Sequence, residues 1–268
     1  MTWNNNNLSF SHLSWWRNCH RAFNMSMSGE PGNMIKVVAE AAAFGNRSEK
    51  LWDTVFEENW FSLSDEEFEL KLFDALSNMS PEDAVKLRTG FSKCFSALKD
   101  LIGTEYHLEA QKQLKVTTDP FMSYAKLDYF VISESRHLIL DAKGSSARNK
   151  KYIEQLLHYA YLYWKLHEII PTTYLFYSRL GCLDEHIFSE NQLQRYGAYY
   201  ENEVREIANK RSNAQDLSDP TILYKATPGD YCFVCAYSKD CRARAIHVAQ
   251  KQKEREEKLL LRDDELFM

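Results

Sequence analysis

The stretch from residue 124 to residue 159 constrains the fold most, because it reads in order as strand, turn, strand, loop and helix. The first strand, at about 126–132, is rich in Tyr, Phe, Val and Ile, which favour strands. Residues 137–140 form a short apolar run that suits a buried strand. Asn149 can cap a helix whose apolar residues recur at helical spacing. The stretch therefore predicts a hairpin followed by an amphipathic helix.

Two aspartates and a lysine stand near the ends of the predicted strands. Side-chain alternation places Asp141 and Lys143 on one face of the second strand. Asp128 lies thirteen residues before Asp141, and a hairpin with a short turn brings the two carboxylates together. Neighbouring carboxylates in a partly dry cleft are stable if one is protonated or a divalent cation lies between them. Such oxygen ligands suit Mg²⁺ or Mn²⁺, and a lysine beside the metal can orient or deprotonate a water.

The predicted helix adds Gln155 and Tyr159, which share a face because they are spaced i, i+4. The ordered set of Asp128, Asp141-x-Lys143 and Gln155-x-x-x-Tyr159 resembles the core of the PD-(D/E)xK nucleases, and its last element is similar to the RecB-like branch. Asp-x-Lys alone occurs by chance in most proteins of this length, so the resemblance depends on the whole set. A surface hairpin followed by an amphipathic helix is the alternative that these residues leave open.

The resemblance implies an α/β fold with a restriction-endonuclease-like mixed sheet flanked by helices. It also implies metal-dependent hydrolysis of DNA phosphodiesters, expected as exonuclease activity on single-stranded DNA or DNA ends. The implied pathways are recombination, repair and CRISPR adaptation. The implied metal ligands are Glu49, Asp128, Asp141 and the carbonyl of Ala142. The implied catalytic residues are Asp128, Asp141, Lys143, Gln155 and Tyr159, with Lys143 acting on the attacking water and Gln155 supporting Lys143 or that water.

Glu49 enters this set through a departure from the family pattern. RecB-like nucleases often have a glycine followed four residues later by a metal-binding histidine, in a segment that corresponds to the helix predicted over 36–60. This chain has Gly45 and then Glu49, so a carboxylate takes the place of the histidine. A glutamate also ligates Mg²⁺ or Mn²⁺. Similar sequences often carry a further glutamate where Glu109 stands, and a site role and a plain strand-end charge both remain open for it.

The composition permits a nuclease but not a globally basic nucleic-acid coat protein. The 268 residues are 44% hydrophobic and 26% charged, and the net charge is −5. We therefore expect DNA to contact a local basic strip, made of Lys143, Arg148, Lys150 and Lys151. The resemblance adds Ser145 and Tyr159 as contacts to the DNA backbone. No apolar run approaches the ~18 residues of a membrane span, and the N-terminus lacks a signal-peptide pattern. We therefore expect a cytoplasmic protein without a membrane partner.

Three cysteines near the C-terminus are spaced C-x-x-C-x5-C, at Cys232, Cys235 and Cys241. Thiolates at this spacing can reach one metal centre, and the absence of secretory context disfavours disulfides. One ligand is missing locally, and Cys19 is the obvious fourth. The arrangement resembles the iron–sulfur staple of RecB-like nucleases, found in AddB-type helicase–nucleases and in the nuclease of CRISPR spacer acquisition. The resemblance implies a [4Fe–4S] cluster, while zinc and uncoordinated thiols remain open.

These signals predict a single nuclease domain over 1–268. Its predicted parts are an iron–sulfur subdomain from both termini (1–35 and 214–248), a helical insert (50–105), a catalytic core (106–180) and a charged tail (249–268). The tail ends in an acidic and then apolar sequence that could dock a helicase, recombinase or integrase partner. The alternatives are a non-catalytic, DNA-end-binding iron–sulfur subunit of a helicase–nuclease or integration complex, and a zinc-stapled interaction module.

Overall fold

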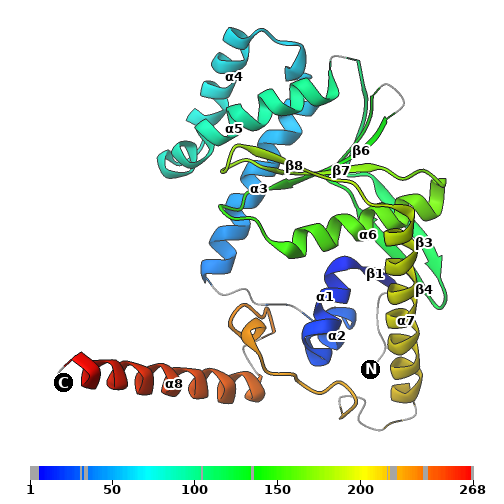
Figure 1. Ribbon diagram of the computed structural model, residues 1–268, viewed down its shortest axis with the longest axis vertical. Coiled ribbons are helices and arrows are strands. Elements are labelled where there is room, and N and C mark those ends of the chain that lie inside the picture. The colour runs from blue at the N-terminus through cyan, green and yellow to red at the C-terminus, as the bar shows by residue number, and fades with distance from the viewer. Residues whose placement is uncertain are drawn as a thin grey trace. The chain divides into compact units, whose positions relative to one another are not determined.

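The computed structural model shows a mixed α/β protein that divides into two compact units (Figure 1). One unit spans Glu40–Arg205, and the other combines Met1–Ala39 with Glu206–Met268. The structure describes residues 6–30, 32, 36–103, 105–133, 136–215, 217, 222–237 and 241–266. The last two residues of the predicted docking tail lie outside these ranges. No helix among the described residues is both long and apolar enough to cross a membrane.

The unit Glu40–Arg205 is built on a five-stranded mixed sheet. In spatial order its strands are β2 (His107–Ala110), β5 (Tyr129–Ser133), β6 (Arg136–Lys143), β7 (Thr172–Tyr177) and β8 (Cys182–His186). The β6–β7 pair is parallel and the other pairs are antiparallel. A parallel neighbour needs a crossover connection, and α6 (Lys150–His167) provides it. The hairpin and the following helix predicted from the sequence are confirmed.

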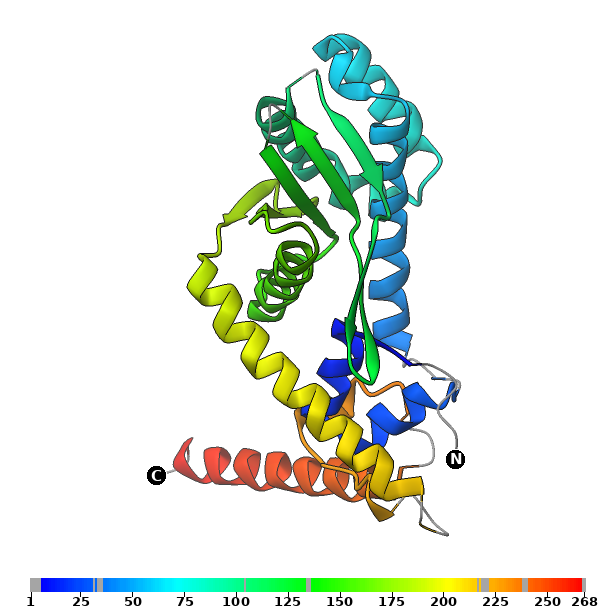
Figure 2. The same cartoon turned by 90° about the vertical axis from the view of Figure 1, so that its right-hand side faces the viewer.

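Helices cover both faces of this sheet (Figure 2). The helices of one face are α3 (Lys36–Glu57), α4 (Asp65–Ser77) and α5 (Pro81–Ile102), with the short 3₁₀ helix Trp60–Ser62 between α3 and α4. There Trp52 stacks on Phe91 at 4.0 Å between ring centroids and meets Phe176 edge-on at 4.9 Å. On the other face α6 packs its Tyr163 ring 5.0 Å from that of Phe130. The central strands β5, β6 and β7 are thus mostly buried, which explains their long apolar runs, whereas the edge strands β2 and β8 are more polar and partly exposed.

Three helices begin at residues whose sequence predicts a helix start. The pattern Ser64-x-x-Glu67 predicts a capping box, and it forms one at α4, with the Ser64 N–H donating to Glu67 Oε2 at 2.9 Å. Ser80 followed by Pro81 predicts a second start, and Ser80 caps α5. Asn149 caps α6 by accepting the Lys151 N–H at 2.9 Å. Residues 188–213, whose apolar side chains predict a long polar helix, form α7 (Glu190–Gln215).

The strands β2 and β5 continue into a second pair, β3 (Gln113–Thr118) and β4 (Phe121–Lys126), in the same register. Ala110 faces Tyr129, and three positions further along, Gln113 faces Lys126. The ribbon bends between these pairs, where Gln111 has a left-handed φ of 54°. From the sequence, residues 106–122 are predicted to form one strand that ends in an Asp-Pro turn. The extent is wrong, because these residues form two strands and the start of a third. Figure 2 shows the β3–β4 ribbon extending beyond the five-stranded sheet.

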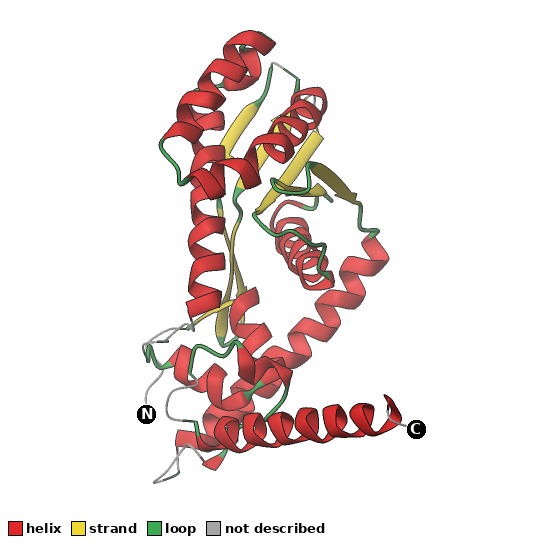
Figure 3. Ribbon diagram, turned by 90° about the vertical axis from the view of Figure 1, so that its left-hand side faces the viewer, coloured by secondary structure: helices red, strands yellow, loops and turns green. Residues whose placement is uncertain are grey.

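The unit formed by the two ends of the chain consists mainly of helices and loops (Figure 3). Its elements are β1 (Asn7–Ser9), α1 (Phe10–Asn18), α2 (His20–Met27), the 3₁₀ helix Asp230–Phe233 and α8 (Arg242–Leu266). Ser9 or Ser11 can cap a helix that continues to about residue 25, so the sequence predicts one helix here. That prediction is wrong in extent, because Cys19 has an extended backbone with φ −162° and ψ 110° and divides the helix. Trp15 of α1 lies 4.8 Å from the Tyr231 ring and 5.4 Å from the Tyr237 ring. These contacts pack the first helix against the cysteine-bearing loop.

Candidate functional site

Asp141 is a buried carboxylate with one oxygen left without a donor. It lies near the end of β6, is 1% exposed, and its Oδ1 accepts no hydrogen bond within the described structure. The Lys143 ammonium contacts Oδ2 as an ion pair. Burial raises the pKa of Asp141, while the lysine opposes that rise. Because buried polar atoms are nearly always satisfied, such a group needs an explanation, and a bound cation is one.

Asp128 meets Asp141 at the same end of the sheet. It directly precedes β5, and its Oδ2 accepts the backbone N–H of Ala142 at 2.9 Å. Burial raises the pKa of Asp128 well above its usual value, and the neighbouring carboxylate of Asp141 raises it further. Glu49 adds a smaller repulsion and Lys143 an attraction. Three acidic groups therefore act on one small region, as the sequence predicted.

Lys143 is a cation held between acids. Burial alone would lower the pKa of Lys143, but Asp141 and Asp128 reverse that effect and raise it. The ammonium also donates to Gln155 Oε1 at 3.4 Å and lies 4.9 Å from the centre of the Tyr152 ring. A charged lysine in this position can orient a water or neutralise a phosphate oxygen, whereas it is a poor base.

Gln155 and Tyr159 lie together on α6, as their spacing predicted. Gln155 Nε2 donates to the Tyr159 hydroxyl at 2.5 Å, while its carbonyl oxygen faces Lys143. Tyr159 is 6% exposed, and burial raises the pKa of its hydroxyl. The tyrosine is therefore placed to orient Gln155, and its burial leaves little surface for the expected contact with DNA.

Glu49 lies near the aspartates because hydrogen bonds connect its helix, α3, to the sheet. Its Oε1 accepts a hydrogen bond from Gln111 Nε2 at 3.1 Å. One residue earlier, Ser48 donates to the buried hydroxyl of Ser178 at 3.0 Å, and Trp52 Nε1 donates to the same oxygen at 2.8 Å. These bonds fix the helix turn that carries Glu49 against the end of β7.

Further contacts between α3 and the sheet involve Tyr129, Asp53 and Gly144. The Tyr129 hydroxyl donates to Asp53 Oδ1 at 2.6 Å and to the Glu49 carbonyl at 3.3 Å. A Cβ on Gly144 would lie 3.1 Å from the Cα of Gly45, so the absence of a side chain lets the exit of β6 approach α3. Gly45 was visible as a motif residue, but no local signal marks the tyrosine, Asp53 or the Ser178 anchor.

The other residues expected near the metal or the DNA have partners of their own. Arg148 forms a two-pronged ion pair with Asp184, at 2.6 Å from Nε and 2.8 Å from Nη2. Ser145 Oγ bonds to the backbone of Ala147. Glu109 pairs with Lys112 at 2.6 Å. Arg148 and Ser145 can still meet a phosphate by exchanging partners, whereas Glu109 is bound within its own strand region.

The four cysteines of the predicted staple line one small cavity in the unit formed by the chain ends. The lining residues are Cys19, Ala226, Thr227, Pro228, Tyr231, Cys232, Cys235, Cys241, Ala243 and Arg244. Burial raises the pKa of Cys235, and the other three thiols add to the rise, so all four lie within electrostatic range. The Gly229 N–H points at Cys232 Sγ, 3.4 Å away. Among the described residues that line this cavity, the four cysteines are the only Cys, His, Asp or Glu side chains.

Neither the carboxylates nor the thiols lie close enough together to form the complete coordination sphere of a metal ion. In the described part of the chain, no three His, Cys, Asp or Glu side chains meet as they would around a metal ion. The chemistry of each donor set nevertheless fits a distinct group. Unsatisfied buried carboxylate oxygens suit a hard cation such as Mg²⁺ or Mn²⁺, and a set of thiols suits iron or zinc.

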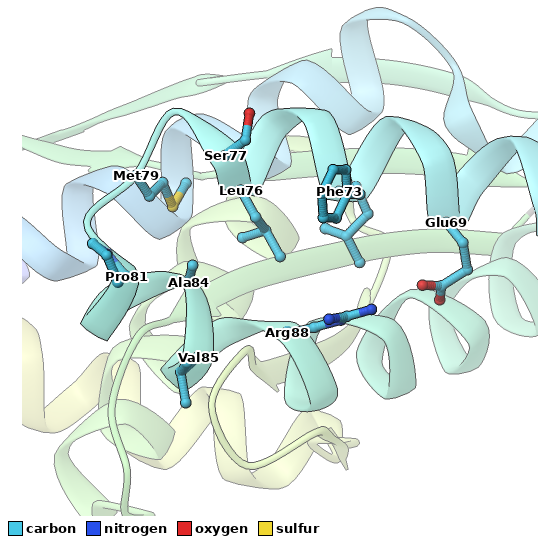
Figure 4. A pocket seen from close by; sticks show the side chains of 10 residues that line it. Glu69, Phe73, Leu76, Ser77, Met79, Pro81, Ala84, Val85 and Arg88 are labelled. Carbon is cyan, nitrogen blue, oxygen red and sulfur yellow. The ribbon is translucent and has the colours of Figure 1, made fainter.

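A larger hollow of about 300 Å³ lies between α4 and α5 (Figure 4). Its lining is mainly apolar, with residues such as Leu72, Leu76 and Val85. Its one carboxylate, Glu69, accepts a hydrogen bond from Ser92 at 3.3 Å. With this single carboxylate, the described lining of the hollow does not offer the set of ligands that a metal ion requires.

Comparison with known proteins gives little further information. No family model matches the sequence, and no curated protein matches it. Among solved structures, the crystal structure of SSO0001 aligns with a TM-score of 0.37 and 10% identity, covering 91% of this chain and 89% of that chain. A likeness at this level carries no argument about fold or function.

Proposed function

We propose that the protein is a metal-dependent DNA nuclease with a restriction-endonuclease-like core, acting on single strands or DNA ends. The observation that carries the proposal is Asp141, a buried carboxylate whose Oδ1 accepts no hydrogen bond from the described residues, beside Asp128 and Lys143. Asp141 lies on β6, Asp128 directly precedes the neighbouring strand β5, and α6 supplies Gln155 to the lysine. The choice of DNA, and of recombination, repair or CRISPR adaptation as the setting, rests on the resemblance of the sequence motifs.

Each residue then has a defined task. Asp128, Asp141 and Glu49, with the carbonyl of Ala142, would hold Mg²⁺ or Mn²⁺. Such an ion supplies Lewis acidity to a phosphodiester oxygen and makes a bound water more acidic. Lys143 orients the attacking water and offsets negative charge on the phosphate, and Gln155 keeps the ammonium in place.

The thiols support a second, structural part of the proposal. Cys19, Cys232, Cys235 and Cys241 would hold a [4Fe–4S] cluster that joins the two ends of the chain. A cross-link between residues so distant in sequence restricts the unfolded chain strongly. We therefore assign the cluster to stability, with zinc as the other group that four thiols accept.

The deciding experiment incubates the purified protein with end-labelled single-stranded and duplex DNA in Mn²⁺, Mg²⁺ or EDTA. We expect cleavage with either metal, none in EDTA, and none by the Asp141→Asn variant. If the wild-type protein binds DNA ends but leaves them intact with both metals, the nuclease proposal fails. A non-catalytic, end-binding subunit of a helicase–nuclease or integration complex would then replace it.

A further inference from the structure

Gln111 connects two of the acidic residues, although it belongs to neither of their elements. It lies at the bend of the long ribbon, and its backbone N–H donates to the Asp128 carbonyl at 2.8 Å. Its side-chain Nε2 donates to Glu49 Oε1 at 3.1 Å. One residue thus bonds to the segment that carries Asp128 and to the side chain that α3 contributes.

The backbone of Gln111 makes this double contact possible. Its φ of 54° is left-handed, which is uncommon for a residue with a side chain larger than that of Asn or Asp. On the opposite strand, the Leu127 N–H donates to the Lys112 carbonyl at 2.9 Å, so pairing continues through the bend. The bend is therefore a fixed part of the ribbon, and it sets the direction of the Gln111 side chain.

Glu49 needs such a partner because its neighbours repel it. Gln111 bonds to the Glu49 side chain and to the Asp128 backbone, and Tyr129, the residue after Asp128, bonds to the Glu49 carbonyl, so two like-charged carboxylates lie in one region. A glutamate side chain has several rotatable bonds and is free to turn toward solvent. A neutral amide donor holds the carboxylate near Asp128 without supplying a positive charge that would compete with a metal.

We propose that Gln111 is a positioning residue that keeps Glu49 ready to join Asp128 and Asp141 around a divalent cation, and so sets the affinity for that cation. The inference rests on the proposed function, since it assumes that the carboxylates bind a metal. It adds a residue that belongs to none of the motifs read from the sequence.

The test is calorimetric titration of Mn²⁺ into the full-length protein in metal-free buffer, with thermal unfolding measured on the same samples. Gln111→Met keeps the length of the side chain and removes the donor. We expect it to weaken Mn²⁺ binding about tenfold, the effect of losing one hydrogen bond to a charged group. Gln113→Met is the matched control, because that residue is exposed two positions further along the same ribbon, and it should bind Mn²⁺ like the wild type.

A double-mutant cycle separates positioning from a general structural role. If Gln111 acts through Glu49, then Gln111→Met should cause no further loss of Mn²⁺ affinity in a Glu49→Ala background. The metal-free Gln111→Met protein should still unfold cooperatively, with a melting temperature within a few degrees of the wild-type value. Additive losses in the double variant would overturn the inference, because they would mean that Gln111 acts by another route.

The two proposals can fail separately. If Asp141→Ala abolishes Mn²⁺ binding while Gln111→Met binds like the wild type, the positioning role is wrong and the metal site stands. If the wild type shows no Mn²⁺ binding that Asp141→Ala removes, the metal site and the positioning role are both wrong.

Discussion

The carboxylate region and the thiol region organise their reactive groups in opposite ways. Around the carboxylates, hydrogen bonds from buried elements fix the supporting groups, as between Trp52 and Ser178 or between Ala142 and Asp128. Around the thiols, the interactions involve loop backbone, such as the Gly229 N–H to Cys232 Sγ and Arg244 Nε to the Cys232 carbonyl. Cys19 itself caps α2 without any side-chain hydrogen bond.

The difference shows what a bound metal would have to supply in each case. The fold already holds the acids together against their mutual repulsion, so a cation there would relieve charge and add chemistry. The described residues of the cysteine loop are joined by a few backbone hydrogen bonds, so a cluster there would supply further cross-links. Loss of metal should therefore affect activity in one region and folding in the other.

The largest expected effect is the loss of DNA cleavage when a residue of the carboxylate region is changed. Asp141→Ala removes a central metal ligand, and we expect cleavage of end-labelled DNA to fall by roughly 10³-fold or more, since a metal ion contributes several kcal/mol and each 1.36 kcal/mol is a factor of ten. The melting temperature should fall as well, because the buried Lys143 ammonium loses its ion-pair partner, so binding of the labelled DNA is measured to show that the variant is folded. A variant with more than a tenth of wild-type activity would contradict the assignment.

A change in the thiol region should lower the thermal stability of the protein. Cys232→Ala should remove the visible absorbance of the cluster and lower the melting temperature by about 5–15 °C, if the cluster constrains the chain like a disulfide worth about 2–4 kcal/mol. Cys182→Ser is the control, because that thiol lies on β8, outside the set. A colourless variant that melts with the wild type would show that nothing stabilising is bound there.

A smaller effect should reveal the repulsion within the acidic group. Burial raises the pKa of Asp128 above its usual 3.8, so its ionised form destabilises the metal-free fold as pH rises through the shifted pKa. Asp128→Asn keeps the acceptor for Ala142 and should raise the melting temperature in EDTA at about pH 8 by about 2–4 °C, the shift expected for roughly 1 kcal/mol. The gain should shrink as the pH is lowered toward 3.8. A gain that is independent of pH would mean that charge is not its cause.

The smallest effect concerns the surface. Arg148 is paired with Asp184, and Asp184→Asn would weaken that pair and leave the guanidinium freer to bind a phosphate. We expect DNA affinity to rise a few-fold at low salt and the gain to disappear at high salt. Arg148→Gln should lower affinity over the same salt range. If neither change alters binding, Arg148 serves only to hold β8.

The sequence predicted features whose causes are local or periodic. Ser64, Ser80 and Asn149 were identified as helix caps because a cap acts within one turn. The proximity of Asp128 and Asp141 could be predicted because strand alternation and a short turn determine it.

Other features arise from contacts between distant residues and could not be predicted. The Ser178 hydroxyl accepts hydrogen bonds from Ser48 and Trp52, which lie more than a hundred residues away in the sequence. The left-handed Gln111 gives no signal, since glutamine is not a residue that favours that conformation. The break at Cys19 was also hidden, because helix-forming residues flank it on both sides.

The unbroken register of the bent ribbon has a consequence for how its length can vary. Adding one residue to each strand near the tip, at Asp119 and Pro120, would leave Gln111 opposite Asp128. A single residue inserted into one strand below the tip would turn every later side chain to the other face of the ribbon. The tip is therefore the place to graft a fluorophore or an affinity tag, while the base of the ribbon accepts no change of length.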